Sequence, residues 1–306
     1  MLLSEFIASA LAGLESLYPR AEARSMVSIL VCERLGVQSW THIANPSFEV
    51  PEQSLAQLEA DLQKLLASEP LQYVLGYAEF YGRRFRVTKD VLIPRPETEL
   101  LVDTVLQKLK SASRDCDGAP KILDLCTGSG CIALTLALEP VGAQLTAIDI
   151  SPAALAIARS QFSAELSQGA EVTFIEADVL DLSEEGLSGA HSKLALGQFD
   201  VIVSNPPYVM EQEKALMRPN VLDHEPALAL FVADDDPLIF YRAIAHHASR
   251  LLSAHGWGIV EINTLLAEPT AECFRQAGLQ DVTILPDLSG KPRFVSFSAV
   301  TPPLSR

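Results

Sequence analysis

The sequence predicts an α/β fold in which a doubly wound, mostly parallel seven-stranded sheet follows an N-terminal helical bundle and a β-hairpin connector. From residue 121 onward, strand-like apolar runs alternate with helical patterns, an alternation typical of a parallel sheet with helices on both faces. The first 66 residues instead carry apolar side chains at helical spacing. With 48% hydrophobic residues in a chain of 306, a packed core can form in one large domain or two modest ones.

The N-terminal segment is predicted to form a small bundle of helices. Apolar residues recur at helical spacing over 3–17, 21–35 and 55–66, with Gly36 positioned to end the second helix and Ser54 positioned to cap the third. A bundle of about 65 residues is near the lower limit for a self-sufficient core. We therefore expect it to pack on the segment that follows.

The chain changes character after these helices. Aromatic and β-branched residues cluster around Gly76 and Gly82, a composition typical of a β-hairpin. We therefore divide the chain into a helical domain (1–68), a β-hairpin connector (69–90) and an α/β domain (91–306).

A helix is predicted to begin at Pro96 and to continue to about Leu106. Proline suits the first turn of a helix, and the carboxylates of Glu97 and Glu99 suit its positive end. Arg95 stands between two prolines just before this helix, an unusual position for a cation, and it can face a site.

The remaining chain supplies the strands and helices of the predicted sheet. The strand-like runs are 122–125, 145–149, 172–176, 201–205, 258–262, 282–285 and 294–297, and the helical patterns are 132–138, 153–165 and 238–252. Residues 182–198 contain several Gly and Ser residues and are predicted to be a surface insertion. Because open α/β sheets bind ligands at the carboxyl ends of their strands, the residues after each strand are the candidates for a site.

The most informative stretch is an apolar strand that runs directly into Asn-Pro-Pro-Tyr. Residues 201–203 are β-branched and fit a central buried strand, and Pro206 and Pro207 end it because they have no N–H to donate. The Asn205 side-chain oxygen and the Pro206 carbonyl are two neighbouring acceptors. They fit a planar NH2 group, either a carboxamide or the exocyclic amine of a base, on which Tyr208 can stack. A plain proline-rich turn fits the tetrapeptide as well.

Glycines follow the first strand of the sheet, where the backbone can approach a ligand at the start of a helix. The loop consists of Cys126, Thr127, Gly128, Ser129 and Gly130. Counted from Gly128, a dinucleotide fingerprint would place its last glycine at Ala133, a tolerated substitute. The lysine and hydroxyl pair of a P-loop is missing, so this loop leaves the class of nucleotide open.

Acidic residues follow the second and third strands. Asp149 can accept both hydroxyls of a ribose, and Asp178 is placed to accept from an adenine amine. Acids also cap helices after strands, and Ser151-Pro152 marks a helix start just after Asp149. A glycine loop, two acids and Asn-Pro-Pro-Tyr after four strands are together hard to attribute to chance.

With these residues, the chain resembles the Rossmann-like S-adenosylmethionine-dependent methyltransferases, and within them the peptide chain release factor N5-glutamine methyltransferases. The resemblance covers nearly the whole chain. It includes the helical N-terminal domain and the stretches Leu75-Gly76 with Phe80, Leu92 to Glu99, Asp124 to Gly130, Asp149, Asn205 to Tyr208, Glu225 to Leu228 and Asp287 to Arg293. The last stretch looks more like the release-factor branch than the ribosomal-protein branch.

The resemblance implies S-adenosyl-L-methionine as the cofactor and assigns roles to individual residues. Cofactor binding falls to Cys126, Thr127, Gly128, Ser129, Gly130, Asp149, Asp178, Val179 and Asn205; catalysis falls to Asn205, Pro206 and Tyr208; and Pro207 joins these three in substrate binding. Two positions depart from the family pattern. Cys126 replaces the usual glycine, and Val179 replaces a residue that is aromatic in some relatives.

The resemblance also implies the substrate, which is the glutamine of the Gly-Gly-Gln motif in peptide chain release factors. Residues 209–236 and the N-terminal helices would then form the docking surface. The sulfonium methyl is already electrophilic, so the residues need only hold the carboxamide nitrogen in line with it. The surplus proton would leave to solvent, because no general base is evident.

Composition indicates which binding partners and which cellular compartment to expect. A net charge of −16 argues against direct nucleic acid binding. An odd count of 5 cysteines without a Cys-x-x-Cys pair fits a reducing cytoplasm and no metal site. His224 is a lone histidine near the expected substrate loop, and we interpret it as structural rather than as a base. His246 and His247 have no metal-ligand partners at useful spacing, and we interpret them as structural or exposed. No apolar run has membrane-spanning length, so we expect a soluble cytoplasmic protein that does not bind membranes.

Three other functions remain open at this stage. The same reaction could act on a glutamine of a ribosomal protein. The two acceptors would also fit adenine-N6 methylation of nucleic acid, which calls for a basic groove and a base-flipping domain. The chain could instead be a nucleoside-binding module without activity, although the Asn and the glycines that such a module would lose are present.

Overall fold

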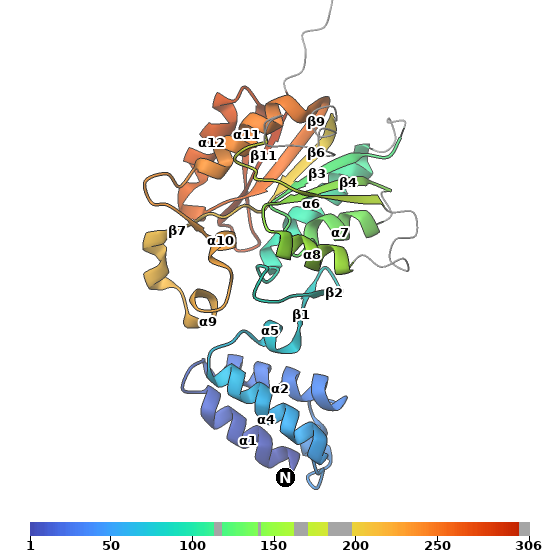
Figure 1. Ribbon diagram of the computed structural model, residues 1–306, viewed down its shortest axis with the longest axis vertical. Coiled ribbons are helices and arrows are strands. Elements are labelled where there is room, and N and C mark those ends of the chain that lie inside the picture. The colour runs from blue at the N-terminus through green and yellow to red at the C-terminus, as the bar shows by residue number, and fades with distance from the viewer. Residues whose placement is uncertain (113–117, 140–141, 162–170, 183–197, 300–306) are drawn as a thin grey trace, which may run out of the picture. The chain divides into compact units, whose positions relative to one another are not determined.

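The computed structural model describes residues 1–112, 118–139, 142–161, 171–182 and 198–299, and Figure 1 shows its ribbon. The chain divides into two compact units. The first is formed by Met1–Tyr77 with Met217–His224, and the second by Ala78–Leu216 with Glu225–Arg306. The N-terminal unit therefore contains a short segment from far along the chain. We call Met217–His224 the returning segment.

The N-terminal unit is a helical bundle, as predicted. Its elements are α1 (Leu3–Leu14), α2 (Arg20–Leu35), α3 (Thr41–Ala44), α4 (Glu52–Leu66), α5 (Leu71–Leu75) and, in the returning segment, α9 (Pro219–Leu222). Leu14, Leu30, Leu58 and Leu65 are fully buried in its core, because apolar residues at helical spacing share one face of each helix.

The boundaries of these helices follow from glycine and proline. Gly36 ends α2 with φ of +65°, in the left-handed region that glycine adopts readily. Helix α4 begins at Glu52, directly after Pro51, so Ser54 lies inside the first turn and the cap predicted for it is wrong. Proline fixes φ and suits the start of a helix, which explains the earlier beginning.

The returning segment is held in the N-terminal unit by polar contacts. Arg218 Nη1 donates to both carboxylate oxygens of Glu22, at 2.9 and 2.8 Å. The His224 ring nitrogen Nε2 lies 3.3 Å from the Ala67 carbonyl oxygen. His224 therefore has a structural partner, in agreement with the sequence interpretation.

The connector is partly helical. The predicted hairpin forms from β1 (Tyr77–Phe80) and β2 (Arg83–Arg86), with the rings of Phe80 and Phe85 edge to face at 5.9 Å. Its first part, expected as strand, is instead α5, which starts after Pro70 and ends at Gly76 with φ of +86°. The aromatic and β-branched residues of this turn fit either structure, and proline and glycine decide between them.

The second unit contains the predicted seven-stranded sheet. Its strands are β3 (Lys121–Leu125), β4 (Gln144–Asp149), β5 (Glu171–Glu176), β6 (Phe199–Ser204), β9 (Leu252–Glu261), β10 (Gln280–Pro286) and β11 (Pro292–Ser298). The strand at 252–261 begins earlier than predicted. The surface insertion predicted for 182–198 falls almost entirely outside the described residues.

The strand order in the sheet is β10-β11-β9-β6-β3-β4-β5. Strands β9, β6, β3, β4 and β5 pair in parallel, whereas β11 runs antiparallel to both of its neighbours. From β3 the chain winds outward through β4 to β5, and it then returns to β6 on the other side of β3. This reversal places a topological switch point at the carboxyl ends of β3 and β6, where ligands bind in open α/β sheets.

Helices cover both faces of this sheet (Figure 1). They are α6 (Pro96–Ala112), α7 (Cys131–Leu138), α8 (Pro152–Gln161), α11 (Ile239–Leu251) and α12 (Ala267–Gln276). Helix α6 begins at Pro96 as predicted but runs past Leu106. The pattern predicted for 153–165 continues beyond Gln161 into residues that are not described.

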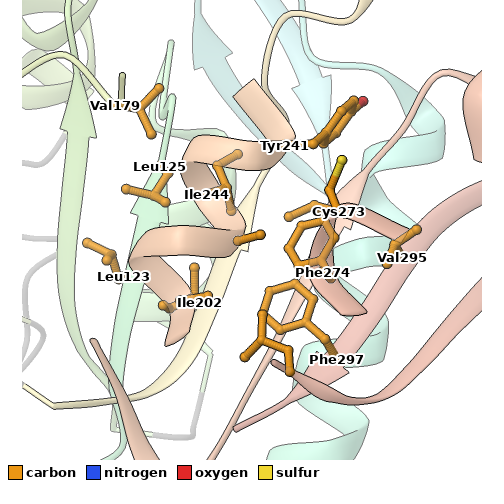
Figure 2. Close-up of a cluster of buried hydrophobic side chains, with 14 of the residues drawn as sticks. Leu123, Leu125, Val179, Ile202, Tyr241, Ile244, Cys273, Phe274, Val295 and Phe297 are labelled. Atoms are coloured by element: carbon orange, nitrogen blue, oxygen red, sulfur yellow. The ribbon is translucent and has the colours of Figure 1, made fainter. Parts of the chain in front are cut away.

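The core has two layers, one on each face of the sheet. Leu123 and Ile202 face α11 and α12, whereas their neighbours Ile122 and Val201 face α6 and α7, because successive side chains of a strand point to opposite faces. Figure 2 shows the first layer. There the stacked ring of Phe274 lies with its centroid 4.3 Å from that of Phe297, which fixes α12 against β11.

Short elements that the sequence did not predict follow Asn-Pro-Pro-Tyr and the strand β9. Strand β7 (Val209–Met210) pairs in parallel with β8 (Phe231–Val232), and η2 (Glu211–Leu216), α10 (Ala227–Leu230) and η3 (Thr264–Leu266) are short helical segments. The small sheet ties the start of the loop after β6 to its end, close to the switch point.

Candidate active site

A cavity of about 410 Å³ opens in the second unit at the switch point. Its walls include these predicted site residues: Cys126, Thr127, Gly128, Ser129, Asp149, Asp178, Val179, Asn205 and Pro207. The volume falls within the roughly 300–1,000 Å³ of small-molecule sites. Of the predicted set, Gly130, Pro206 and Tyr208 are not among the lining residues.

The loop after β3 is held to β4 by its backbone amides. The Thr127 amide donates to the Ile148 carbonyl at 2.9 Å, and the Gly128 amide donates to Asp149 Oδ2 at 2.7 Å. Gly128 and Gly130 have φ of +56° and +80°. A Cβ on Gly130 would lie 3.0 Å from the Cβ of Ala158, so this glycine lets α7 and α8 pack closely.

Cys126 adopts the left-handed conformation that glycine would adopt without strain. Its φ is +61°, so the departure from the family pattern costs backbone freedom but still permits the turn. Burial, followed by the nearby carboxylate of Asp149, raises the pKa of the Cys126 thiol well above its usual range. The thiol is therefore neutral and lies on the wall of the cavity.

The two acids expected to bind a nucleoside lie on the cavity wall. Besides the Gly128 amide, Asp149 accepts the Ser151 amide through Oδ1 at 2.9 Å. Asp178 Oδ1 accepts the Leu180 amide at 2.8 Å. Each carboxylate oxygen has two lone pairs, so both acids keep the capacity to accept hydroxyl or amine donors from a ligand.

Val179 is only 4% exposed, yet it contributes to the wall of the cavity. Its carbonyl oxygen accepts a hydrogen bond from His247 Nε2 at 2.9 Å. Burial lowers the pKa of His247, so the neutral imidazole donates this bond. His247 therefore supports the loop after β5, as its structural interpretation requires.

Asp124 lies buried beneath the glycine loop. It is 0% exposed and accepts the Thr127 hydroxyl through Oδ2 at 2.6 Å, while Oδ1 has no hydrogen-bond partner among the described residues. Burial raises the pKa of Asp124 to about 7. Burial thus favours the protonated carboxyl, and the Thr127 hydroxyl is the side-chain donor that joins it to the loop.

Asn205 is held by a chain of side chains that the sequence interpretation missed. Its Nδ2 donates to Thr98 Oγ1 at 3.2 Å, and the Thr98 hydroxyl donates to Glu261 Oε2 at 2.7 Å. Glu261 is 1% exposed. Thr98 stands inside the quoted Pro-Glu-Thr-Glu stretch, and Glu261 is an acid at the end of an apolar strand, so both signals were present in the sequence.

Tyr208 joins the same chain from the opposite side. Its hydroxyl donates to Glu261 Oε1 at 2.9 Å, and its ring packs against the buried core layer of Figure 2. Burial, followed by the charge of Glu261, raises the pKa of Tyr208 well above its usual range, so the phenol stays a donor. The Tyr208 hydroxyl is therefore bonded to Glu261, the carboxylate that also accepts from Thr98.

Arg95 lies on the wall of the cavity and is paired. Its guanidinium donates to Glu225 Oε1 at 2.6 Å, and the other oxygen of that buried carboxylate accepts the Ile93 amide at 3.1 Å. The unusual cation between two prolines therefore faces the site, as the sequence indicated, and it joins the segment before α6 to the segment before α10.

The described ranges hold no cluster of three or more His, Cys, Asp or Glu side chains that could bind a metal ion. Within the same ranges, no helix combines the length and apolar character needed to cross a membrane.

Comparison with known families and proteins gives consistent matches. The family described as "PrmC N-terminal domain" matches residues 5–76, and the family described as "Methyltransferase domain" matches residues 122–218. A release factor glutamine methyltransferase of Bacteroides thetaiotaomicron is 41% identical over 284 residues, covering 93% of this chain and 95% of that protein. One of Flavobacterium psychrophilum is 38% identical over 299 residues, covering 96% and 98%.

A solved structure with a similar fold is the hMettl16 catalytic domain, in complex with the MAT2A 3'UTR hairpin 6. It aligns with a TM-score of 0.52 at 15% identity, covering 82% of this chain and 84% of that one. At such low identity the likeness concerns the fold alone, and it agrees with the doubly wound sheet described above.

Proposed function

The chain belongs to the release factor glutamine methyltransferase family, and we propose that it methylates the glutamine of the Gly-Gly-Gln motif in peptide chain release factors. The methyl group passes from S-adenosylmethionine to the side-chain amide nitrogen, N5. The position of the Asn205 amide carries this proposal. Thr98 occupies its Nδ2 at 3.2 Å, which leaves Oδ1 as an acceptor on the cavity wall.

The residues on the cavity wall fit S-adenosylmethionine. Asp149 would accept the ribose hydroxyls, and Asp178 would accept the adenine amine beside the aliphatic Val179. The loop Cys126–Gly130 would bring its backbone close to the rest of the molecule. When bound, the cofactor supplies a methyl group on a sulfonium. This methyl group is already electrophilic, so an enzyme of this kind needs no metal ion to activate it.

The protein's own contribution is to hold the glutamine amide. The Asn205 Oδ1 and the Pro206 carbonyl accept its two N–H groups, which fixes the plane of the amide and raises the electron density on its nitrogen. Positioning of this kind contributes about 7–11 kcal/mol at its upper limit. Pro207 forms the adjoining wall, and Tyr208 holds the loop through Glu261. The surplus proton of the amide leaves to solvent.

The substrate protein would dock on residues 209–236 and on the N-terminal helices. In the described part of this loop, Leu216 and Leu228 are 87% and 59% exposed, and Leu228 also lies at the cavity. Leu228 is thus an exposed apolar side chain at the cavity, available for contact with a partner protein. The net charge of −16 favours a neutral or basic partner surface.

Methyl transfer from labelled cofactor tests this function. Purified release factor serves as substrate, beside its Gly-Gly-Gln→Gly-Gly-Ala variant, with a ribosomal protein and DNA as competitors. We expect label on the wild-type release factor alone. Label on the ribosomal protein would keep the chemistry and change the substrate, and label on DNA would show that the acceptor pair holds a base amine.

A further inference from the structure

A buried carboxylate sits two hydrogen bonds away from the Asn205 amide. Asn205 Nδ2 lies 3.2 Å from Thr98 Oγ1, which lies 2.7 Å from Glu261 Oε2. The Tyr208 hydroxyl lies 2.9 Å from Glu261 Oε1. These side chains come from α6, β9 and the loop after β6, and Glu261 is 1% exposed. The chain therefore links distant elements through two buried side chains, Thr98 and Glu261.

The direction of each bond in this chain follows from the chemistry of the carboxylate. An ionised carboxylate only accepts hydrogen bonds, so the Thr98 hydroxyl must donate its one proton to Glu261. The Thr98 oxygen is then left to accept, and its partner must be an N–H of Asn205. The NH2 end of the Asn205 amide is thereby turned toward Thr98, and its oxygen is turned away.

Burial raises the pKa of Glu261, whereas most of the groups around its carboxylate favour the ionised form. Two hydroxyl donors face its two oxygens, and the positive charge of Arg293 on β11 acts on it, against the negative charge of Glu97 on α6. The Tyr241 hydroxyl on α11 donates to the Glu261 backbone carbonyl at 3.3 Å and not to its carboxylate, and it accepts the Asn263 amide at 3.3 Å. The carboxylate thus has donors and a cation nearby, which is the condition for a stable buried charge.

We propose that Glu261 is a positioning residue for methyl transfer: through Thr98 it fixes the Asn205 amide so that Oδ1, not Nδ2, faces the substrate. The inference rests on the proposed function, because the glutamine amide presents N–H groups and needs acceptors. With the opposite orientation, two NH2 groups would face each other, and the glutamine would lose one of the acceptors that hold its plane.

The negative charge has a second consequence. A hydrogen bond to an ionised acceptor polarises the bonds behind it, so Glu261 increases the negative charge on Asn205 Oδ1. That oxygen then accepts more strongly as positive charge develops on the substrate nitrogen during transfer. Thr98 and Glu261 thus act on the substrate only through Asn205.

Three variants test the proposal. In Glu261→Gln, the new NH2 can donate to Thr98, so the Thr98 hydroxyl can turn and donate to Asn205, whose amide then presents NH2 to the cavity. We expect kcat to fall by about 100-fold, the size of effect that a small misplacement produces, with little change in KM or in cofactor affinity. Thr98→Val, which lacks the hydroxyl, should also lower kcat, and Thr98→Ser should restore it.

Tyr241→Phe is the matched control. Tyr241 is 0% exposed and bonds to the Glu261 backbone rather than to its carboxylate. Its loss should lower the melting temperature as the Glu261 variant does, with kcat close to that of the wild type. Comparable kcat in Glu261→Gln and Tyr241→Phe would overturn the proposal and leave Glu261 with a purely structural role.

A pH profile separates orientation from packing. Protonated Glu261 can itself donate to Thr98, so the kcat of the wild type should fall as the pH drops through the pKa of Glu261, which burial raises above its usual range. In Glu261→Gln, kcat should be low and lack this acid limb. An unchanged limb in that variant would contradict the proposal.

A spectroscopic readout makes the inference independent of turnover. The side-chain NH2 signals of Asn205 in a 1H–15N spectrum, identified by their loss in Asn205→Ala, should shift in Glu261→Gln and Thr98→Val and stay in place in Thr98→Ser. Signals that do not move would overturn the inference. A wild type that methylates no glutamine would instead refute the proposed function, while shifted signals would still show that Glu261 acts on the Asn205 amide through Thr98.

Discussion

The two halves of the cavity hold their polar groups in different ways. On the cofactor half, Asp149 and Asp178 accept backbone amides from the loops beside them. On the acceptor half, Asn205 is held by side chains: Thr98 is 107 residues away in sequence, and Thr98 and Glu261 are 163 residues apart. A bond from a backbone amide to one carboxylate is lost only when that carboxylate changes, whereas a chain of several side chains fails when any one member changes. The acceptor half is therefore the more sensitive to mutation.

The same contrast separates the two carboxylates buried under the cavity. Asp124 has one hydroxyl donor and an oxygen without a partner among the described residues. Glu261 has a hydroxyl on each oxygen and a cation in range. Burial raises the pKa of both carboxyls, but the two hydroxyl donors and the cation make Glu261 the better site for a charge.

The largest effect is expected from a substitution that changes only the acceptor half of the cavity. Asn205→Ala removes the side-chain acceptor for the glutamine amide, and we expect kcat to fall by about 10²–10³-fold, as for other lost transition-state hydrogen bonds. Cofactor affinity should change by less than about 3-fold, because at most one weak hydrogen bond is lost. Single-turnover transfer and calorimetry measure the two effects, and normal turnover by the variant would refute the proposed mechanism.

A second substitution changes only the cofactor half of the cavity and is expected to weaken cofactor binding. Asp149→Ala removes the partner of the Gly128 and Ser151 amides and the proposed ribose acceptor, so the Kd for the cofactor should rise about 10–100-fold. At saturating cofactor, kcat should stay close to that of the wild type. Asp200→Ala is the control, because Asp200 also accepts a backbone amide, that of Lys121 at 2.9 Å, outside the cavity. A large loss of kcat with unchanged Kd would contradict the division into halves.

The third prediction concerns stability and the unpartnered carboxyl. Burial raises the pKa of Asp124 from its ordinary value of 3.8 to about 7 in the folded protein. Its contribution to stability is therefore fully present below about pH 4 and is lost as the pH rises through 7. Asp124→Asn stays neutral and can still accept from Thr127. At pH 8 the variant should be more stable than the wild type by about 2 kcal/mol.

That difference should shrink toward pH 5, where the wild-type carboxyl is protonated. Urea unfolding at several pH values measures it. A wild type that gains stability over the variant between pH 5 and pH 8 would show that Asp124 is a satisfied carboxylate in the folded protein and would remove the contrast with Glu261.

The smallest effect is expected at Cys126. Cys126→Gly relieves a left-handed backbone but loses a side chain that contacts the core and adds freedom to the unfolded chain, so the free energy of unfolding should change by less than about 1 kcal/mol. Gly130→Ala in the same loop should destabilise, because its Cβ would meet Ala158 at 3.0 Å and its φ is +80°. Thermal unfolding of both variants tests this difference, and equal losses would contradict it.

The sequence predicted the parts of the fold that depend on local pattern. The β-branched run 201–203 became a buried central strand, and Pro96 became the start of α6, since burial and proline geometry act within a few residues. The turn α5 was mistaken for strand because Tyr73 and Val74 suit both structures. Its type was decided by the Pro70 and Gly76 at its ends.

The site, like the fold, was predictable only where it depends on local sequence patterns. Most of the residues predicted after strands line the cavity, whereas Gly130, Pro206 and Tyr208 do not, because parallel strands bring their carboxyl ends to one edge but not every side chain there points inward. The link from Asn205 to Thr98 and Glu261, and the pair of Arg95 with Glu225, join positions more than 100 residues apart in sequence. No periodicity connects such positions, so these partners emerge only when the chain is folded.

The returning segment has a consequence for exchanging parts between relatives. Because Met217–His224 belongs to the N-terminal unit, a chimera that transplants only the first 77 residues would combine a foreign bundle with the host's returning segment. Arg218 would then have to find an acid where Glu22 stands, and His224 a carbonyl where Ala67 stands. The bundle and the returning segment therefore need to be exchanged together, although they are far apart in the sequence.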